Sequence, residues 1–310
     1  MTAAAPTIVA TCGGLNPGTW TDAVYGPLLL HAIELADVTG RRPRVAHLNT
    51  AGGDQRSIEG TELEAARQAG VEASHVRFFP HPNVENLREH ILTRDVIWVS
   101  GGSLVNLLAV WRAHGLDAIL REAWERGVVL AGGSAGALCW HSGGTTSSYG
   151  PGLDAVADGL GFLPGSLGVH YDSDPNRRPV HEAAVASGAL PPGFAVDEGV
   201  GLVYAGTGLV EAVTERAGQY AWRIEADGDG GDRGDVDRAD AGDSGSPTAR
   251  SVIETRLTPR LLPPVPSLPA PQSLPAPQSL PAPQSLPAPQ SLPAPQSPLH
   301  PTDRPTFEEA

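Results

Sequence analysis

The sequence predicts an α/β protein with a doubly wound, mostly parallel sheet. Through the first 140 residues, short β-branched runs alternate with longer amphipathic segments, which is typical of repeated strand-helix-strand units. Four of the expected strands end in small residues: CGG at 12–14, AGG at 51–53, SGG at 100–102 and GGS at 132–134. Parallel sheets bind ligands where their strands end, because tight turns expose backbone N–H groups there. We therefore expect a functional site at that edge of the sheet.

Hydrophobic periodicity predicts the individual elements in order. Strands are expected over 7–11, 44–50, 75–79, 95–100 and 128–132. Helices are expected over 21–38, 57–69, 84–92 and 104–126, with Gly115 interrupting the last one. Further along, we expect a strand over 166–171, a helix over 179–187 and a strand over 193–198. Short strands within 200–226 and 251–257 complete the prediction as a C-terminal antiparallel extension.

Two segments lack the composition of a packed domain. Residues 227–249 form an acidic stretch with seven Asp and two Arg in its first 19 positions, too polar to offset its ordering entropy. Residues 263–310 contain SLPAPQ five times and 16 prolines, which favours an extended polyproline II conformation. The expected organisation is thus one domain over 1–262, with a disordered acidic loop, and a disordered proline-rich tail.

Charge and composition exclude several classes of function. The net charge of −14, without a basic cluster, argues against nucleic acid and anionic membranes as partners, and no uncharged apolar run is long enough to span a bilayer. All 21 basic residues are arginine, which excludes Schiff-base, phosphate-loop and Ser-Lys chemistry. No glycine-rich turn matches a nucleotide-binding motif, so we expect no nucleotide cofactor. We expect no other cofactor and no metal ion either. Two cysteines without a secretory signal predict free thiols and a cytoplasmic location.

Ser134 is the candidate nucleophile. It lies in the segment AGGSAGA at 131–137, directly after an apolar run, which predicts a sharp turn from a strand into a helix. Glycines at 132, 133 and 136 are expected to permit the dihedrals of this turn, and Ala135 leaves the hydroxyl uncovered. The following helix would direct free N–H groups toward a developing oxyanion. The alternative is a glycine-rich turn that only connects a strand to a helix.

A serine nucleophile needs a base and a carboxylate that orients the base. His170 is the candidate base because it closes a predicted strand, whereas His141 is expected about two helical turns beyond the serine and directed away from it. Candidate acids are Asp172 and the pair Asp197 and Glu198 at the end of another strand. Residues 197 and 198 would point to opposite faces, and the sequence alone leaves the choice open.

Taken together, four motifs resemble a known group of enzymes. They are VSGGSLVNLLAVWR at 99–112, GGSAGA at 132–137, HYD at 170–172 and AVDEGVGLVY at 195–204. Their order is similar to that in peptidase family S51, the serine peptidases that include peptidase E (alpha-aspartyl dipeptidase) and cyanophycinase. The resemblance covers roughly residues 6–260. It implies a class I glutamine amidotransferase-like fold, a flavodoxin-like three-layer sandwich.

The resemblance also implies roles for individual residues. Ser134 matches the nucleophile, His170 its base, and Glu198 the acid of those members that use a Ser-His-Glu triad. Other members place an aspartate shortly after the nucleophile, where this chain has no carboxylate before Asp154. The oxyanion hole would be formed by backbone N–H groups, those of Gly101, Gly102 and Ala135. Family members often have asparagine where this chain has Ser103, which leaves substrate positioning open.

The substrates implied by the resemblance are short peptides with an N-terminal aspartate. Arg177 and Arg178, just ahead of a predicted helix, are candidates for binding the substrate carboxylate, and Asn106 is a further candidate substrate-binding residue. The partner is therefore a small peptide, and the oligomeric state stays open, with a homodimer as one option.

Alternatives within and outside this class remain at this point. Cyanophycinase-like cleavage of Asp-Arg peptides would use the same chemistry. A glutamine amidotransferase needs cysteine at the position of Ser134, and an α/β-hydrolase esterase places its acid before its histidine, so both fit less well. From another class, the chain could be a non-catalytic scaffold that presents the leucines of its proline-rich tail to a partner.

Overall fold

The computed structural model describes residues 3, 5–227 and 251–265. The acidic loop expected over 227–249 lies outside these residues except for Asp227, and so does the expected tail after residue 265. Among the described helices, none is both long enough and apolar enough to cross a bilayer.

The first sheet has eight strands, and its centre is parallel as predicted. Its order is β16-β13-β12-β1-β7-β6-β4-β5. The parallel strands are β1 (Thr7–Thr11), β7 (Val129–Gly133), β6 (Val96–Val99), β4 (Arg44–Leu48) and β5 (Glu72–Val76). The antiparallel extension consists of β12 (Val200–Ala205) and β13 (Gly208–Thr214), with β16 (Arg260–Leu261) parallel to β13.

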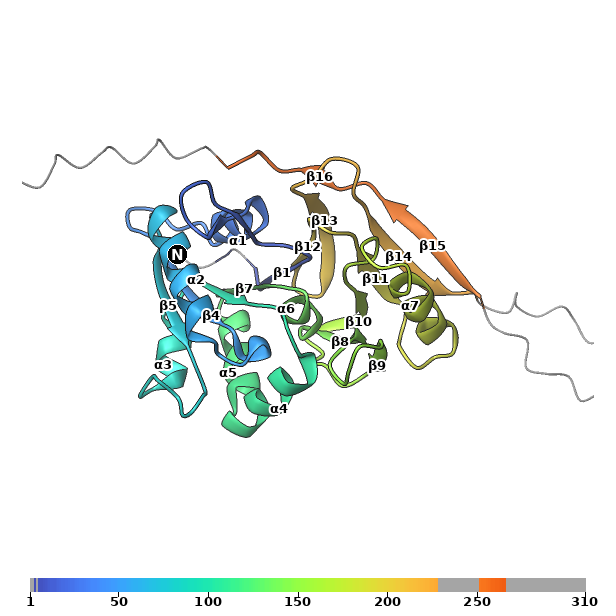
Figure 1. The fold of residues 1–310 in the computed structure, drawn as a ribbon, viewed down its shortest axis with the longest axis horizontal. Coiled ribbons are helices and arrows are strands. Elements are labelled where there is room, and N and C mark those ends of the chain that lie inside the picture. The colour runs from blue at the N-terminus through green and yellow to red at the C-terminus, as the bar shows by residue number, and fades with distance from the viewer. Residues whose placement is uncertain (1–2, 4, 228–250, 266–310) are drawn as a thin grey trace, which may run out of the picture. The chain divides into compact units, whose positions relative to one another are not determined.

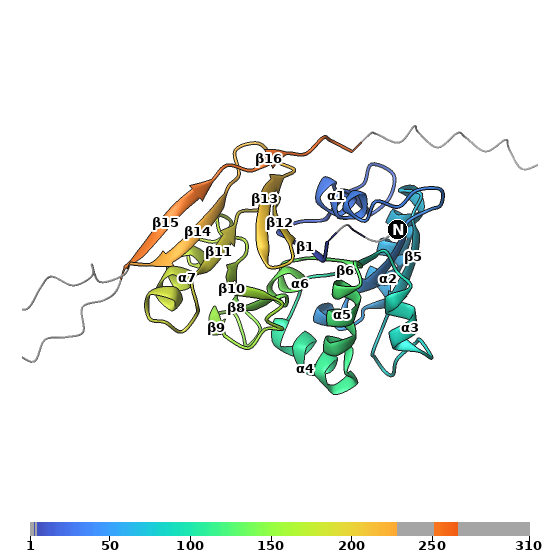
Figure 2. The ribbon, with the colours of Figure 1, turned by 180° about the vertical axis from the view of Figure 1, so that it is seen from behind.

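Helices cover both faces of this sheet. Alternate residues of β1 enter different apolar clusters, Ile8 and Ala10 on one face and Val9 on the other, as the two-residue period of a strand dictates. Figures 1 and 2 show α1 on one side of the parallel strands and α4 and α5 on the other. The helices are α1 (Pro27–Leu35), α2 (Arg56–Gln68), α3 (Leu87–Leu92), α4 (Leu104–His114) and α5 (Leu116–Glu125), with a short 3₁₀ turn at Thr50–Gly52. The predicted three-layer α/β arrangement is confirmed.

Six strands form a second sheet, whereas the sequence predicted a single sheet with a C-terminal antiparallel extension. The strands expected over 166–171, 193–198 and 251–257 belong to this second sheet. Its order is β15-β14-β11-β10-β8-β9, and β8, β10 and β11 run parallel within it. The strands are β8 (His141–Thr146), β9 (Asp154–Val156), β10 (Leu163–Gly168), β11 (Gly193–Val196), β14 (Ala221–Ala226) and β15 (Val252–Leu257). Leu163, Leu167 and Val196 share one apolar cluster with Ile8 and Leu130 of the first sheet, so the two sheets have a continuous core.

Several element boundaries differ from the sequence prediction, each for a local reason. The helix expected from residue 21 begins only at Pro27, because a short hairpin of β2 (Leu15–Pro17) and β3 (Ala23–Tyr25) precedes it. Gly115 divides the segment 104–126 as expected, and its φ of 68° is one that glycine tolerates well. Helix α7 (Arg177–Ala186) begins two residues earlier than predicted, and so contains both arginines rather than following them.

Candidate active site

Ser134 occupies a strained turn between β7 and α6 (Ala135–Leu138). Its φ of 57° and ψ of −118° are unusual for a residue with a side chain. The turn is fixed from both sides, because the N–H of Ser134 donates to the carbonyl of Thr11 (3.0 Å) and its own carbonyl accepts from the N–H groups of Ala137 and Leu138. This is the geometry of a nucleophile elbow, in which the backbone holds the hydroxyl at the end of the sheet.

The glycines of this turn are required for a different reason than the sequence suggested. None of Gly132, Gly133 and Gly136 has a positive φ; the strained dihedral is that of Ser134 itself. Instead, the glycines allow close backbone contacts: a Cβ at Gly136 would lie 2.1 Å from the carbonyl oxygen of Val99, and one at Gly132 would lie 2.5 Å from that of Gly136. Helix α6 has only four residues, so its dipole is weaker than that of the longer helix we expected.

His170 lies beside Ser134. The strand expected over 166–171 ends at Gly168, so His170 belongs to the following turn, where it adopts a φ of 56°. Its Nε2 lies 3.0 Å from Oγ of Ser134. The other described histidine considered as a base, His141, does not follow Ser134 on a helix, because α6 ends at Leu138 and His141 begins β8.

The structure distinguishes the three candidate carboxylates. Nδ1 of His170 contacts Oε1 of Glu198. Asp172 does not reach the imidazole; its Oδ1 accepts from the backbone N–H of Glu198 (2.8 Å), and its Oδ2 accepts from the Gln219 amide (2.6 Å). Asp172 therefore supports the backbone that carries Glu198.

Asp197 points away from the site. Its carboxylate accepts hydrogen bonds from the backbone N–H of Tyr220 (2.9 Å) and from Nε1 of Trp222 (3.1 Å). Burial raises its pKa, and the two donors oppose that shift. The expectation that residues 197 and 198 face opposite directions agrees with these contacts, although β11 ends at Val196 and both residues lie in the turn after it.

The candidate oxyanion-hole residues lie at the ends of β6 and β7. A Cβ at Gly101 would lie 3.1 Å from Cβ and 3.6 Å from Oγ of Ser134, so this backbone passes directly beside the serine. Gly102 has a φ of 139° and packs against the carbonyl of Ala51. Ala135 is the first residue of α6, where a backbone N–H has no partner within the helix.

The three candidate substrate-binding residues are not equivalent. The guanidinium of Arg178 lies over the rings of Tyr171 (4.8 Å) and Trp222 (4.2 Å) and 3.6 Å from Glu254, so it is already engaged. In contrast, the Nη1 atom of Arg177 reaches back toward the carbonyl of Val169 (3.4 Å), the residue before His170.

Asn106 is exposed in the first turn of α4. Its backbone N–H donates to the N-cap hydroxyl of Ser103 (3.3 Å). This residue is therefore held at the same strand end as Gly101 and Gly102, the end of β6.

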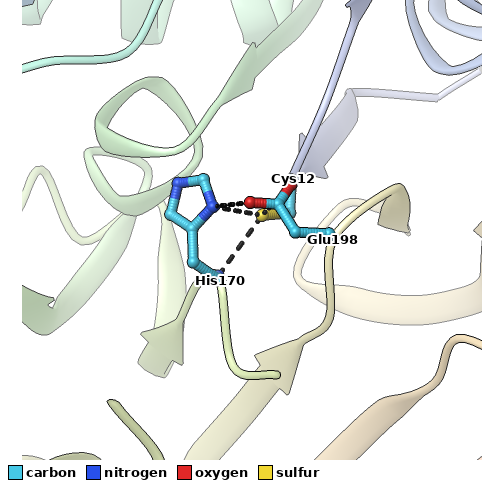
Figure 3. Close-up of side chains that lie close together, drawn as sticks. All are labelled: Cys12, His170 and Glu198. Carbon is cyan, nitrogen blue, oxygen red and sulfur yellow. Dashed lines mark hydrogen bonds and ion pairs between the residues drawn. The ribbon is translucent and has the colours of Figure 1, made fainter. Parts of the chain in front are cut away.

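Cys12 is the residue that the sequence analysis missed. It follows β1, is fully buried, and its Sγ lies 3.1 Å from Nδ1 of His170 and 3.5 Å from Oε2 of Glu198 (Figure 3). The backbone N–H of His170 also donates to this sulfur (3.3 Å). Burial and the neighbouring Glu198 raise the pKa of the thiol, so it stays protonated at neutral pH. The only signal in the sequence was its position in the small-residue segment CGG.

The arrangement of these side chains is suited to proton transfer. An imidazole that donates from Nδ1 to a carboxylate presents a lone pair on Nε2, which can accept the proton of a hydroxyl 3.0 Å away. These groups come from four separate turns, those after β1, β7, β10 and β11, which meet where the parallel strands of both sheets end.

Comparisons of this chain with known proteins find peptidases. The model of peptidase family S51 matches residues 26–211, more than half of the chain. An uncharacterized peptidase of Bacillus subtilis strain 168, YgaJ, is 40% identical over 183 residues, which are 59% of this chain and 78% of the relative.

Two solved structures of peptidases also match this chain. A candidate peptidase E protein from Listeria monocytogenes EGD-e is 16% identical, with a TM-score of 0.46 over 67% of this chain and 98% of its own. A peptidase from an acI-B1 Actinobacterium is 18% identical, with a TM-score of 0.49 over 72% of this chain and 91% of its own. The two sequence matches are sufficient for the assignment: the chain belongs to peptidase family S51 and is a serine-type peptidase that acts on peptides.

Proposed function

We propose that the protein hydrolyses short peptides, in particular dipeptides with an N-terminal aspartate, through a Ser134-His170-Glu198 triad and an acyl-enzyme. The observation that carries this proposal is the position of His170, with Nε2 at 3.0 Å from Oγ of Ser134 and Nδ1 against Glu198. Because the serine and the histidine both have φ values near 57°, the turns hold them in strained conformations, as is common where geometry serves function.

In the first half of the reaction, His170 removes the proton of Ser134 as the hydroxyl attacks the peptide carbonyl. Glu198 keeps the proton of the imidazole on Nδ1 and stabilises the imidazolium that forms. Backbone N–H groups of Gly101, Gly102 and Ala135 bind the oxyanion. His170 then donates its proton to the leaving amine, and the N-terminal aspartyl group stays on the serine as an ester.

In the second half, a water molecule takes the place of the amine. His170 removes a proton from this water, which attacks the ester carbonyl, and the same N–H groups bind the second oxyanion. Collapse of this intermediate returns the proton to Ser134 and releases free aspartate. The cycle consumes one water and leaves the enzyme unchanged.

Arg177 is our candidate for binding the side-chain carboxylate of the substrate. Its guanidinium is held next to the backbone of residue 169, whereas Arg178 is occupied by two aromatic rings and Glu254. A guanidinium binds a carboxylate through paired hydrogen bonds. An Arg177→Ala enzyme should therefore lose most of its preference for Asp over Ala at the first substrate position, while Arg178→Ala should keep it.

The experiment that tests the function is a panel of Asp-Xaa, Glu-Xaa and Ala-Xaa dipeptides, assayed with the purified full-length protein and with Ser134→Ala. The proposal predicts that Asp-Xaa substrates are cleaved fastest and that the variant is inactive. Including the Asp-Arg polymer separates cyanophycinase-like cleavage from dipeptidase activity. Equal rates on all three dipeptide classes would refute the proposed specificity, and an active Ser134→Ala enzyme would refute the triad.

We further propose that the enzyme acts in the cytoplasm. Both cysteines of the chain, Cys12 and Cys139, are unpaired, which is typical of proteins in a reducing compartment. Fractionation of cells that express the tagged protein tests this proposal.

A further inference from the structure

Cys12, His170 and Glu198 bring three different metal-binding atoms together beside Ser134. Sγ of Cys12, Nδ1 of His170 and a carboxylate oxygen of Glu198 all lie within 4.8 Å of one another (Figure 3). Proton transfer between serine and histidine does not need a thiol, so the proposed function leaves Cys12 without a role. The buried sulfur of Cys12 nevertheless contacts both His170 and Glu198, so its position needs a separate explanation.

We propose that these three side chains bind one thiophilic divalent metal ion, with Zn²⁺ as the best match, and that the bound ion inhibits the peptidase. Zinc sites have bonds of about 2.0–2.3 Å, so neighbouring ligand atoms of a tetrahedral site lie roughly 3.3–3.7 Å apart. Sγ of Cys12 lies 3.5 Å from Oε2 of Glu198 and 3.1 Å from Nδ1 of His170. His170 therefore has to move slightly away from both Cys12 and Glu198, and water completes the coordination.

The ligand atoms are held in place by the surrounding backbone. The N–H of Cys12 donates to Val200 (2.7 Å), and its carbonyl accepts from the N–H of Gly199 (2.6 Å), directly after Glu198. The N–H of His170 donates to the sulfur itself. Such support orients ligands before the metal arrives. The side chains of His170 and Glu198 are 25% and 30% exposed, so an ion can approach from solvent although the sulfur is buried.

Inhibition follows from the tautomer of His170. In the peptidase, Nδ1 carries the proton and Nε2 accepts the proton of Ser134. The metal takes the lone pair of Nδ1, so the imidazole proton moves to Nε2, and the thiol of Cys12 releases one proton to solvent. One thiolate and one carboxylate then neutralise the two charges of the ion. With a proton on Nε2, His170 can no longer act as a base toward Ser134. The inhibitory effect thus rests on the proposed function, whereas the binding does not.

The donor set also predicts selectivity. A thiolate favours Zn²⁺, Cd²⁺ and Co²⁺, whereas Mg²⁺ and Ca²⁺ prefer sites made of oxygen atoms. Co²⁺ is a useful probe because its bond to sulfur gives a charge-transfer absorption band in the near ultraviolet, which reports binding without any assay of activity.

The test is a titration of the full-length protein with Co²⁺ in buffer free of thiols and chelators. We expect the charge-transfer band to saturate at one equivalent and to disappear when Zn²⁺ is added, while Mg²⁺ has no effect. Cys12→Ala should abolish the band, and Cys139→Ala, which removes the other buried thiol, should retain it. In the dipeptide assay, Cys12→Ala should raise the inhibition constant for Zn²⁺ roughly 100-fold or more. Even the loss of a residue that only hydrogen-bonds to a metal ligand lowers metal affinity by about 10–100-fold, and Cys12 is itself a ligand.

Cys12→Ser serves as a second variant, because serine is nearly the same size as cysteine. Near-ultraviolet circular dichroism without metal checks that both variants fold. Absence of the band in the wild-type protein, or an equal band in folded Cys12→Ala, would overturn the proposed metal site. A cobalt band in a protein that hydrolyses none of the peptides would support the metal site and refute the peptidase mechanism. Peptide hydrolysis without a cobalt band would support the peptidase mechanism and refute the metal site.

Discussion

Glu198 and Asp197 are adjacent carboxylates with different contacts, and a pair of amide substitutions tests whether only Glu198 serves the proposed triad. Glu198 contacts the imidazole of His170, and 30% of its side chain is exposed. Asp197 accepts hydrogen bonds from Tyr220 and Trp222 instead. Glu198→Gln and Asp197→Asn make the same chemical change one residue apart, so each is a matched control for the other.

Glu198→Gln should lower kcat by roughly 10³–10⁴-fold, which is about 4–5.5 kcal/mol of transition-state stabilisation. Loss of the orienting carboxylate from a buried triad costs about 10⁴, and the partial exposure of Glu198 places the expected loss at or below that value because water replaces part of the interaction. The free energy of unfolding should change little, since this pair is partly open to solvent and exposed ion pairs contribute about 0–1 kcal/mol.

Asp197→Asn should show the opposite pattern. The amide of asparagine has one oxygen to accept from Tyr220 and Trp222, where the carboxylate of Asp197 has two. Burial already disfavours the charge of Asp197, so removing that charge costs little. We therefore expect a loss of about 1–2 kcal/mol in the free energy of unfolding. kcat should fall less than about tenfold, because the substitution leaves the transition-state interactions intact. Steady-state kinetics on an Asp-Xaa dipeptide and urea denaturation measure both quantities. Equal losses of kcat in the two variants would refute the assignment of Glu198.

Two further predictions concern stability. Gly136→Ala places a Cβ 2.1 Å from a backbone oxygen of Val99, so the free energy of unfolding in urea should fall by roughly 1–3 kcal/mol; an unchanged value would contradict the close packing behind Ser134. Burial lowers the pKa of both His141 and His181 to about 4, while an unfolded histidine has a pKa of about 6.5. The unfolded chain alone takes up these protons as the pH falls from 6.5 toward 4, so each histidine should cost about 2 kcal/mol of stability between pH 7 and pH 5. Urea titrations at the two pH values measure the loss, and His181→Gln should reduce it; a flat profile would contradict the prediction.

Much of the first sheet was predictable because its signals are local. The strands of its parallel centre are short apolar runs between amphipathic helices, and the segment GGSAGA combines a strand end with tightly packed glycines around Ser134. Gly115 likewise ends α4 where the pattern indicated. Each of these features depends on residues that are close together in the sequence, so hydrophobic periodicity and the positions of glycines are enough to find them.

The second sheet and Cys12 depend on contacts between distant segments. Strand β8 reads HSGGTT, without apolar alternation, because Gly143 and Gly144 lie against the backbones of Val156 and Leu167. The side chain of Cys12 contacts a histidine 158 positions later in the chain. No local pattern records such pairs.

The sequence could not decide between Asp197 and Glu198 for the same reason, because the deciding contacts come from distant segments. Asp197 and Glu198 lie in a turn rather than on a strand, and the positions of Tyr220 and Trp222 decide which way Asp197 points. The sequence could only narrow the acid to three residues.

The role of Ser134 as the nucleophile is tested most directly by covalent labelling. We predict that a fluorophosphonate adds once to the full-length protein and that peptide mapping by mass spectrometry finds the adduct on Ser134. His170→Ala should slow the labelling strongly, because no base then accepts the proton of the Ser134 hydroxyl as it attacks the probe. A protein that cleaves dipeptides but remains unlabelled at Ser134, or carries the label on another residue, would contradict the account.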